Sequence, residues 1–141
     1  MMDELAELYQ SILLEHNKNP HNKKKIQCVS CSAEGYNATC GDEINVDLEL
    51  DNDVIKDIGF TGQGCAISQA SGSLMTLFVQ GKPKQEAAEL ANKVIGMLAG
   101  DAPIDPAQWG DLAALGGVRQ FPARIKCATL AWHALLSALK Q

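Results

Sequence analysis

The fold is decided by residues 44–65, which read INVDLELDNDVIKDIGFTGQGC. Residues 44–50 alternate strictly between apolar and polar side chains, as in a strand that buries only one face. Asp51-Asn52-Asp53 is a turn sequence, and the apolar residues that follow it up to Phe60 predict a returning strand, so the two strands form a hairpin. After Gly62-Gln63-Gly64-Cys65 the pattern changes to that of a helix.

The segments on either side of this hairpin indicate an α+β fold. A further strand is predicted around residues 35–40. The spacing of apolar residues and the positions of proline and glycine predict helices at residues 3–17, 66–80, 83–99 and 122–139. The first helix has its apolar stripe on Leu5, Leu8, Tyr9, Ile12 and Leu13. Residues 100–121, with Pro103, Pro106 and Gly116-Gly117, predict an irregular excursion with a short helix. Strands followed by helices favour a small antiparallel three-stranded sheet with helices packed on one face.

The composition excludes several classes of protein. A chain of 141 residues with 46% hydrophobic and 21% charged residues has the size and balance of one globular domain. The formal net charge of −5 lacks the basic footprint of a nucleic-acid-binding protein. No apolar stretch approaches the ~18 residues of a membrane span, and the first residues do not resemble a secretory signal. We expect a single domain over residues 1–141, located in the cytoplasm, that binds neither nucleic acid nor membrane.

Five cysteines, at positions 28, 31, 40, 65 and 127, are the unusual feature of the composition. An odd number of cysteines without a secretion signal favours metal binding or thiol chemistry over disulfides. Cys40 lies where the chain enters a strand, Cys65 where a strand gives way to a helix, and Cys127 in the early turns of the last helix. The preceding glycines and the N-terminus of a helix favour a thiolate at Cys65.

Asp42 can lie beside Cys40 if Gly41 turns the chain. With the other two cysteines they would form a set of three thiolates and one carboxylate, which suits zinc or an iron–sulfur cluster. The positive charges of Arg124 and Lys126 would offset the negative charge of such a site. The three cysteines are separated by 25 and 62 residues, so their spacing alone is equally compatible with three buried cysteines that bind no metal.

Several other reactive side chains have a plain structural interpretation beside a functional one. Cys28-Val29-Ser30-Cys31 is a redox pair, half of a zinc site, or two incidental loop cysteines. His133 lies about 120° around the helix from Cys127, as follows from ~100° per residue, so we expect it at the surface. His16 and His21 flank a helix end, and we expect structural roles for both.

Polar residues near the cysteines leave similar alternatives. Lys126 is either a charge partner of Asp42 or a solvated lysine on a helix face. Ser68 either packs between helices or donates a hydrogen bond to the thiolates. The acidic residues of the hairpin are expected to form only its solvated face and turn, and these are Asp47, Glu49, Asp51, Asp53 and Asp57.

Three motifs, in this order, resemble the IscU/NifU-N superfamily of iron–sulfur cluster assembly proteins. They are Cys40-Gly41-Asp42, residues 62–71 (GQGCAISQAS) and residues 121–132 (FPARIKCATLAW), and residues 19–23 (NPHNK) fit as well. The resemblance covers nearly the whole chain. Within the superfamily the chain resembles the SufU branch, because Lys126 stands where IscU scaffolds have a histidine. The long segment around residues 100–118 is also similar to the insertion that marks SufU proteins.

The resemblance implies an IscU/NifU-N-like and SufE-like fold, and one Zn²⁺ held by Cys40, Asp42, Cys65 and Cys127. It implies sulfurtransferase activity in which a SufS-type, PLP-dependent cysteine desulfurase passes persulfide sulfur to Cys40, for use by downstream iron–sulfur assembly proteins. On docking, a histidine of the desulfurase would replace Cys40 on the zinc, while Arg124 and Lys126 support the site.

Two alternatives stay open beside this interpretation. One is an IscU-like scaffold that assembles a [2Fe–2S] cluster, or binds iron transiently, on Cys40, Cys65 and Cys127. The other is a domain in which zinc is purely structural.

Overall fold

The computed structural model describes residues 2–141, with side chains described from Glu7 onward. The elements follow the chain in the order α1 (Met2–Lys18), β1 (Cys31–Asn37), β2 (Asp42–Asp51), β3 (Val54–Gln63), α2 (Ala66–Val79), α3 (Lys84–Ala99), α4 (Pro106–Trp109), the 3₁₀ helix η1 (Gly110–Gln120) and α5 (Pro122–Leu139). The side chain of Leu5, which we place on the apolar stripe of the first helix, lies outside the described residues.

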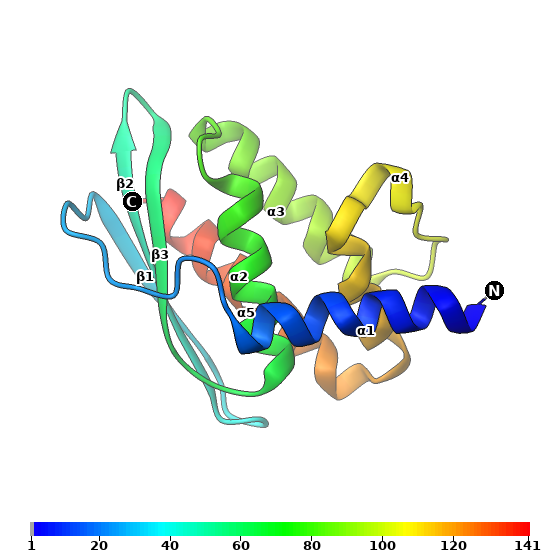
Figure 1. The fold of residues 1–141 in the computed structure, drawn as a ribbon. Coiled ribbons are helices and arrows are strands. Elements are labelled where there is room, and N and C mark those ends of the chain that lie inside the picture. The colour runs from blue at the N-terminus through cyan, green and yellow to red at the C-terminus, as the bar shows by residue number, and fades with distance from the viewer. Residues whose placement is uncertain (1) are drawn as a thin grey trace.

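The three strands form one antiparallel sheet in the order β1-β2-β3, and the helices gather on one of its faces (Figure 1). Helix α5 packs across β1 and β2, and α2 packs against β3 and α5. The α+β fold predicted from the sequence is therefore confirmed.

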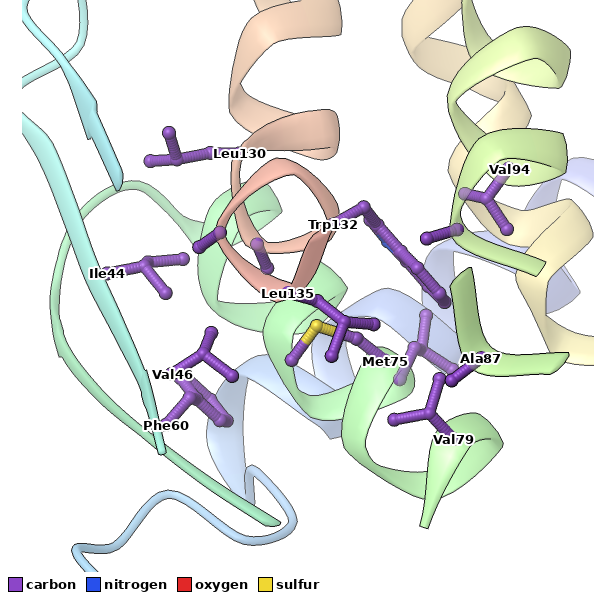
Figure 2. Close-up of a cluster of buried hydrophobic side chains, with 14 of the residues drawn as sticks. Ile44, Val46, Phe60, Met75, Val79, Ala87, Val94, Leu130, Trp132 and Leu135 are labelled. Carbon is purple, nitrogen blue, oxygen red and sulfur yellow. The ribbon is translucent and has the colours of Figure 1, made fainter. Parts of the chain in front are cut away.

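The core lies between the sheet and these helices. Ile44, Val46 and Leu48 of β2 are buried, as the alternation in the sequence predicts. Figure 2 shows Ile44, Val46 and Phe60 on the sheet side of this core, facing side chains of α2 and α5. On the far side of α5, Trp132 is fully buried, and its indole Nε1–H donates a 3.0 Å hydrogen bond to Ser71 Oγ of α2.

The β2–β3 hairpin determines where the chain arrives at α2. Asn52 and Asp53 both have positive φ, of 51° and 62°, as in the type I′ turns that match the twist of paired strands. Strand β3 then returns along β2 until Gln63 pairs with Glu43. Helix α2 consequently begins beside the start of β2.

Two predictions need correction, one on the first strand and one on the first helix. The first strand is β1, Cys31–Asn37, and not residues 35–40, so Cys31 lies in the sheet opposite Leu48 and is buried. Its place in the core cluster, and not in a loop, explains why burial raises the pKa of its thiol. On α1, Leu8 is 55% exposed, although the periodicity places it on the apolar stripe.

The predicted excursion at residues 100–121 is mostly helical. Helices α4 and η1 run without a gap from Pro106 to Gln120, straight through Gly116-Gly117. Leu112, Leu115 and Val118 are buried, and their spacing of three residues is the period of a 3₁₀ helix. Burial of this stripe, which packs with α1, α3 and α5, outweighs the weak helix preference of the glycines. That residues 100–118 are an insertion stays a prediction.

Within residues 2–141, none of the helices combines the length and apolar character that a membrane span requires.

Candidate metal centre

Three segments that are distant in the sequence meet at one end of the sheet. The β1–β2 turn carries Cys40 and leads directly into Asp42, the first residue of β2. Gly41 has a φ of +68°, a conformation that side-chain-bearing residues rarely adopt, and this turn brings the carboxylate of Asp42 back toward Cys40. The first turns of α5 supply Cys127, and the start of α2 supplies Cys65.

The side chains of Cys40, Asp42 and Cys127 converge. One potential ligand atom from each lies within 4.8 Å of the other two, and the Sγ atoms of Cys127 and Cys40 are 3.0 Å apart. Asp42 and Cys127 are buried, whereas Cys40 is partly exposed at the surface. The structure thus brings together three of the four residues predicted as ligands.

Cys65 lies next to this group. It is the N-cap residue of α2, as expected from its position after a glycine-rich strand end. Its backbone N–H donates a 2.8 Å hydrogen bond to Asp42 Oδ1. Among the described residues, the group within 4.8 Å does not include the Cys65 thiol, but this thiol is near enough to contribute to the raised pKa of Cys127.

Asp42 is a fully buried carboxylate that is held in its charged form. Burial alone would raise its pKa, but hydrogen bonds from the Cys65 N–H and from the Cys127, Ser68 and Asn37 side chains together hold it below its ordinary value. The Asn37 amide lies 3.3 Å from Asp42 Oδ2, and the Ser68 hydroxyl lies 3.2 Å from Oδ1. Since Asp42 is completely shielded from solvent, this network fixes both its orientation and its charge.

Gly64 provides the space that the carboxylate occupies. A Cβ atom at position 64 would overlap Asp42 Oδ1 and would lie 2.6 Å from Ser68 Oγ. Contacts this short do not occur between unstrained atoms, so any larger residue would displace the carboxylate.

The pKa of the Cys127 thiol is raised above its ordinary value. Burial is the largest cause of this increase in pKa, and hydrogen bonds with Cys40, Asp42 and Cys65 add to it. A buried thiol beside a carboxylate and two further thiols is a set that repels additional negative charge. A divalent cation relieves this repulsion and replaces the protons, and soft thiolates are the ligands that zinc and iron–sulfur clusters prefer. The residues present therefore fit such a group.

The two predicted supporting residues differ in their placement. The Arg124 Nη1 atom lies 4.0 Å from Cys40 Sγ, and the hydrogen bond with Cys127 and the charges of Cys65 and Cys40 raise the pKa of its guanidinium. Lys126 is exposed and forms no ion pair with Asp42 within residues 2–141. Its supporting role stays a prediction.

Asn37 is the residue of this site that sequence reasoning missed. It ends β1 directly opposite Asp42 and is buried, with its amide also 3.6 Å from Cys127 Sγ. The register of the β1–β2 hairpin is the signal that identifies it. Ser68, which we considered as a donor to the thiolates, donates to the carboxylate instead.

The remaining cysteines and histidines lie apart from the centre. Cys28 is exposed and Cys31 is buried in β1, and neither joins a metal-binding group among the residues that the structure describes. His133 is exposed, as predicted. His16 is buried, with Nδ1 2.7 Å from Ser73 Oγ, and the His21 backbone N–H donates to the same oxygen, so both have the expected structural roles.

Comparison with known proteins gives consistent matches over almost the entire chain. The family model described as "NifU-like N terminal domain" matches residues 8–141. The chain is 43% identical to "Zinc-dependent sulfurtransferase SufU" of Bacillus subtilis (strain 168) over 131 residues, 93% of this chain and 88% of the relative. It is 41% identical to "Iron-sulfur cluster assembly scaffold protein IscU" of Streptococcus pyogenes serotype M1 over 140 residues, 99% of this chain and 87% of the relative.

A solved structure agrees with these matches. The crystal structure of an iron–sulfur cluster assembly scaffold protein for the SUF system from Fervidobacterium islandicum AW-1 aligns with a TM-score of 0.83 and 36% identity. The alignment covers 91% of this chain and 93% of that one.

Proposed function

The chain belongs to the NifU-like N-terminal domain family, and from that premise we propose that it is a zinc-dependent sulfur acceptor for iron–sulfur cluster assembly. In this proposal, Cys40 receives persulfide sulfur from a SufS-type cysteine desulfurase, and downstream assembly proteins take the sulfur from it. The relative from Bacillus subtilis, whose name states a zinc-dependent sulfurtransferase, supports this choice within the family.

The observation that carries the proposal is the convergence of Cys40, Asp42 and Cys127 within 4.8 Å, with Cys65 beside them. These four residues would hold the zinc ion. When bound, zinc keeps coordinated thiols deprotonated at neutral pH. The buried carboxylate, held charged by its hydrogen bonds, supplies the one oxygen ligand.

Cys40 is the sulfur acceptor because it combines proximity to the centre with access from outside. Its turn is exposed on both sides, at Thr39 and Gly41, whereas Cys127 is buried and Cys65 is fixed as the N-cap of α2. The Arg124 guanidinium next to Cys40 Sγ offsets negative charge as sulfur arrives.

The transfer step balances without an added oxidant. The Cys40 thiolate attacks the terminal sulfur of the persulfide on the partner, and a new S–S bond forms at Cys40. The S–S bond within the partner's persulfide breaks, and its electron pair leaves on the partner's cysteine as a thiolate. Cys40 then carries the sulfur as a persulfide.

A second candidate function is that of a scaffold that assembles a [2Fe–2S] cluster on Cys40, Cys65 and Cys127. The relative from Streptococcus pyogenes, named as an IscU scaffold and matched over 99% of this chain, supports it. Three thiols at the centre are chemically able to hold a cluster as cargo.

The metal and acid-labile sulfide of protein purified without oxygen distinguish the two candidates. The sulfur-acceptor proposal predicts about one zinc per chain, since the four residues would form a single site, and no sulfide. Iron and sulfide in equal amounts, with visible cluster absorption, would instead identify the scaffold.

A further inference from the structure

A hollow of about 660 Å³ lies on the face of the sheet that the helices leave uncovered. Its lining includes Glu34 and Tyr36 of β1, Glu43 and Asn45 of β2, and Thr61 of β3. Successive side chains of a strand point to opposite faces, and Ile44, which separates the two β2 residues, is buried in the core. The hollow is therefore on the outer face of the sheet, away from α2 and α5.

The hollow and the metal centre lie on opposite faces of the same end of the sheet, and consecutive residue pairs of β1 and β2 contribute to each. Tyr36 pairs with Glu43, and the next pair along the same hairpin is Asn37 with Asp42. The inner-face pair belongs to the centre, while the outer-face pair belongs to the hollow. Cys40 lies in the turn that joins these strands, so the hollow on the outer face is adjacent to the thiol at the end of the sheet.

The carboxylates of the hollow differ from most other acidic residues of the sheet in having no partner within the described part of the chain. Glu34 and Glu43 are exposed, and among the described residues neither forms an ion pair within 4.0 Å. Three other carboxylates of this face have partners: Asp57 with Lys24 at 3.6 Å, Glu49 with Lys56 at 3.4 Å, and Asp47 with Ser32 and Asn45 at 2.8 Å. Asp51, at the hairpin end of β2, is exposed and forms no ion pair among the described residues.

Another part of the outer face is covered by the chain itself. The segment between α1 and β1 crosses it (Figure 1), with the Asn22 carbonyl accepting from the Phe60 N–H and the Lys24 backbone lying over Gly59. At its end, Ser30 bonds to β2 through the Leu48 carbonyl and the Leu50 N–H. Apart from Asp51 at the far end of β2, the unpaired carboxylates of the described strands lie in the half of this face next to the centre.

Tyr36 adds an aromatic surface to these charges. It is 66% exposed, which is unusual for a large ring, and it lies directly opposite Glu43. A ring flanked by carboxylates is well matched to a guanidinium, which stacks on the aromatic face and pairs with carboxylates through its planar N–H groups.

We propose that this hollow docks an arginine-bearing, basic segment of the cysteine desulfurase that delivers sulfur to Cys40. This inference rests on the proposed function and adds a recognition surface to it. The hollow positions the partner at the end of the sheet, while the chemistry takes place at the turn.

The test is the stimulation of alanine production by a SufS-type desulfurase, titrated with the E34K/E43K double variant at low and at high ionic strength. Charge complementarity acts mainly on encounter and on salt dependence, so the half-saturating concentration should rise about tenfold at low salt. The maximal stimulation and the bound metal should not change. A matched control, Glu89→Lys with Asp101→Lys, makes the same change in net charge at exposed positions away from the sheet.

Tyr36 is tested separately from the charges. Tyr36→Ala should raise the half-saturating concentration, whereas Tyr36→Phe, which keeps the ring, should resemble the unchanged protein. Thermal unfolding and metal content of each variant establish that the fold and the centre are intact.

The possible outcomes separate the two proposals. If the unchanged protein does not stimulate the desulfurase, the proposed function fails. If it does, but E34K/E43K titrates as before or no worse than the control pair, the hollow is not the docking surface. If E34K/E43K and the control pair raise the half-saturating concentration equally, net charge alone steers the encounter, and this result also overturns the inference.

Discussion

The backbone N–H of Cys65 donates a 2.8 Å hydrogen bond to Asp42 Oδ1, and this contact ties the start of α2 to the start of β2. It places one predicted ligand at the N-cap of a helix and orients another, so the same bond is part of the fold and of the centre. The N-terminus of α2 also favours the negative charge of the carboxylate.

Replacing Asp42 should therefore weaken both metal binding and the fold. Asp42→Ala leaves the Cys65 N–H and the Asn37 amide without their acceptor, which costs about 1–3 kcal/mol per buried unpaired group. Asp42→Asn keeps one acceptor oxygen and should be less destabilising, while still losing the charge. Chelator competition and urea unfolding measure the two effects, and an Asp42→Ala protein with unchanged stability would contradict this account of the contact.

Gly64→Ala should disturb the centre, because the added Cβ overlaps the Asp42 carboxylate. A matched control is Gly96→Ala in α3, where a Cβ meets no atom within 4 Å. The control should stabilise the protein by about 0.5–1 kcal/mol through helix propensity. Metal affinity and thermal unfolding report the difference, and equal effects of the two substitutions would show that the space at Gly64 is not needed.

The stability of the protein should fall as the pH drops below about 6.5, because of His16. Burial lowers the pKa of this imidazole, as does the charge of His21, although Asp111 and Glu15 act in the opposite direction. The folded protein therefore takes up this proton less readily than the unfolded chain, whose value is near the ordinary 6.5. The contribution of neutral His16 is complete above pH 6.5, is lost as the pH falls through that value, and levels off below the folded pKa.

His16→Gln should reduce this part of the pH dependence, whereas His133→Gln, at an exposed position, should leave it unchanged. Urea unfolding at a series of pH values measures it. A pH profile that is the same in His16→Gln and in the unchanged protein would contradict the assignment.

Removal of the metal should lower the midpoint of thermal unfolding. A ligand that binds only the folded state adds about 4 kcal/mol when present at a thousand times its Kd, and a chelator removes this contribution. Cys127→Ser should show a low midpoint with or without chelator. Cys28→Ser, an exposed cysteine outside the centre, should still respond to the chelator, and a failure to respond would place the metal elsewhere.

The regular elements of this fold could be predicted from the sequence because their patterns are local. The alternation of residues 44–50 and the proline at the start of α5 each indicate one element and its place. The length of helix η1 was not predicted, because its apolar residues recur every three positions and the proline and glycine residues suggest a break. Burial of that stripe by the surrounding helices is a tertiary effect that the local sequence does not contain.

The centre could be predicted only in part for the same reason. Residue chemistry suggested Cys65 at the start of a helix and Asp42 beside Cys40, and both positions are found. Residue chemistry suggested that Cys127 joins Cys40, but spacing alone left this grouping no better than three separate buried cysteines, and the resemblance to a family favoured it. Asn37 depends on the register of β1 with β2, which is set by the completed sheet.

The most direct test of the central claim is to locate the sulfur after reaction with the desulfurase. The metal-loaded protein is incubated with a SufS-type desulfurase and cysteine without oxygen, and its peptides are analysed by mass spectrometry without reduction. The account predicts one added sulfur on the peptide that contains Cys40, and loss of both this product and the stimulated alanine production in Cys40→Ser, with Cys28→Ser unaffected. Undiminished stimulation by Cys40→Ser, or added sulfur on another cysteine in its place, would contradict it.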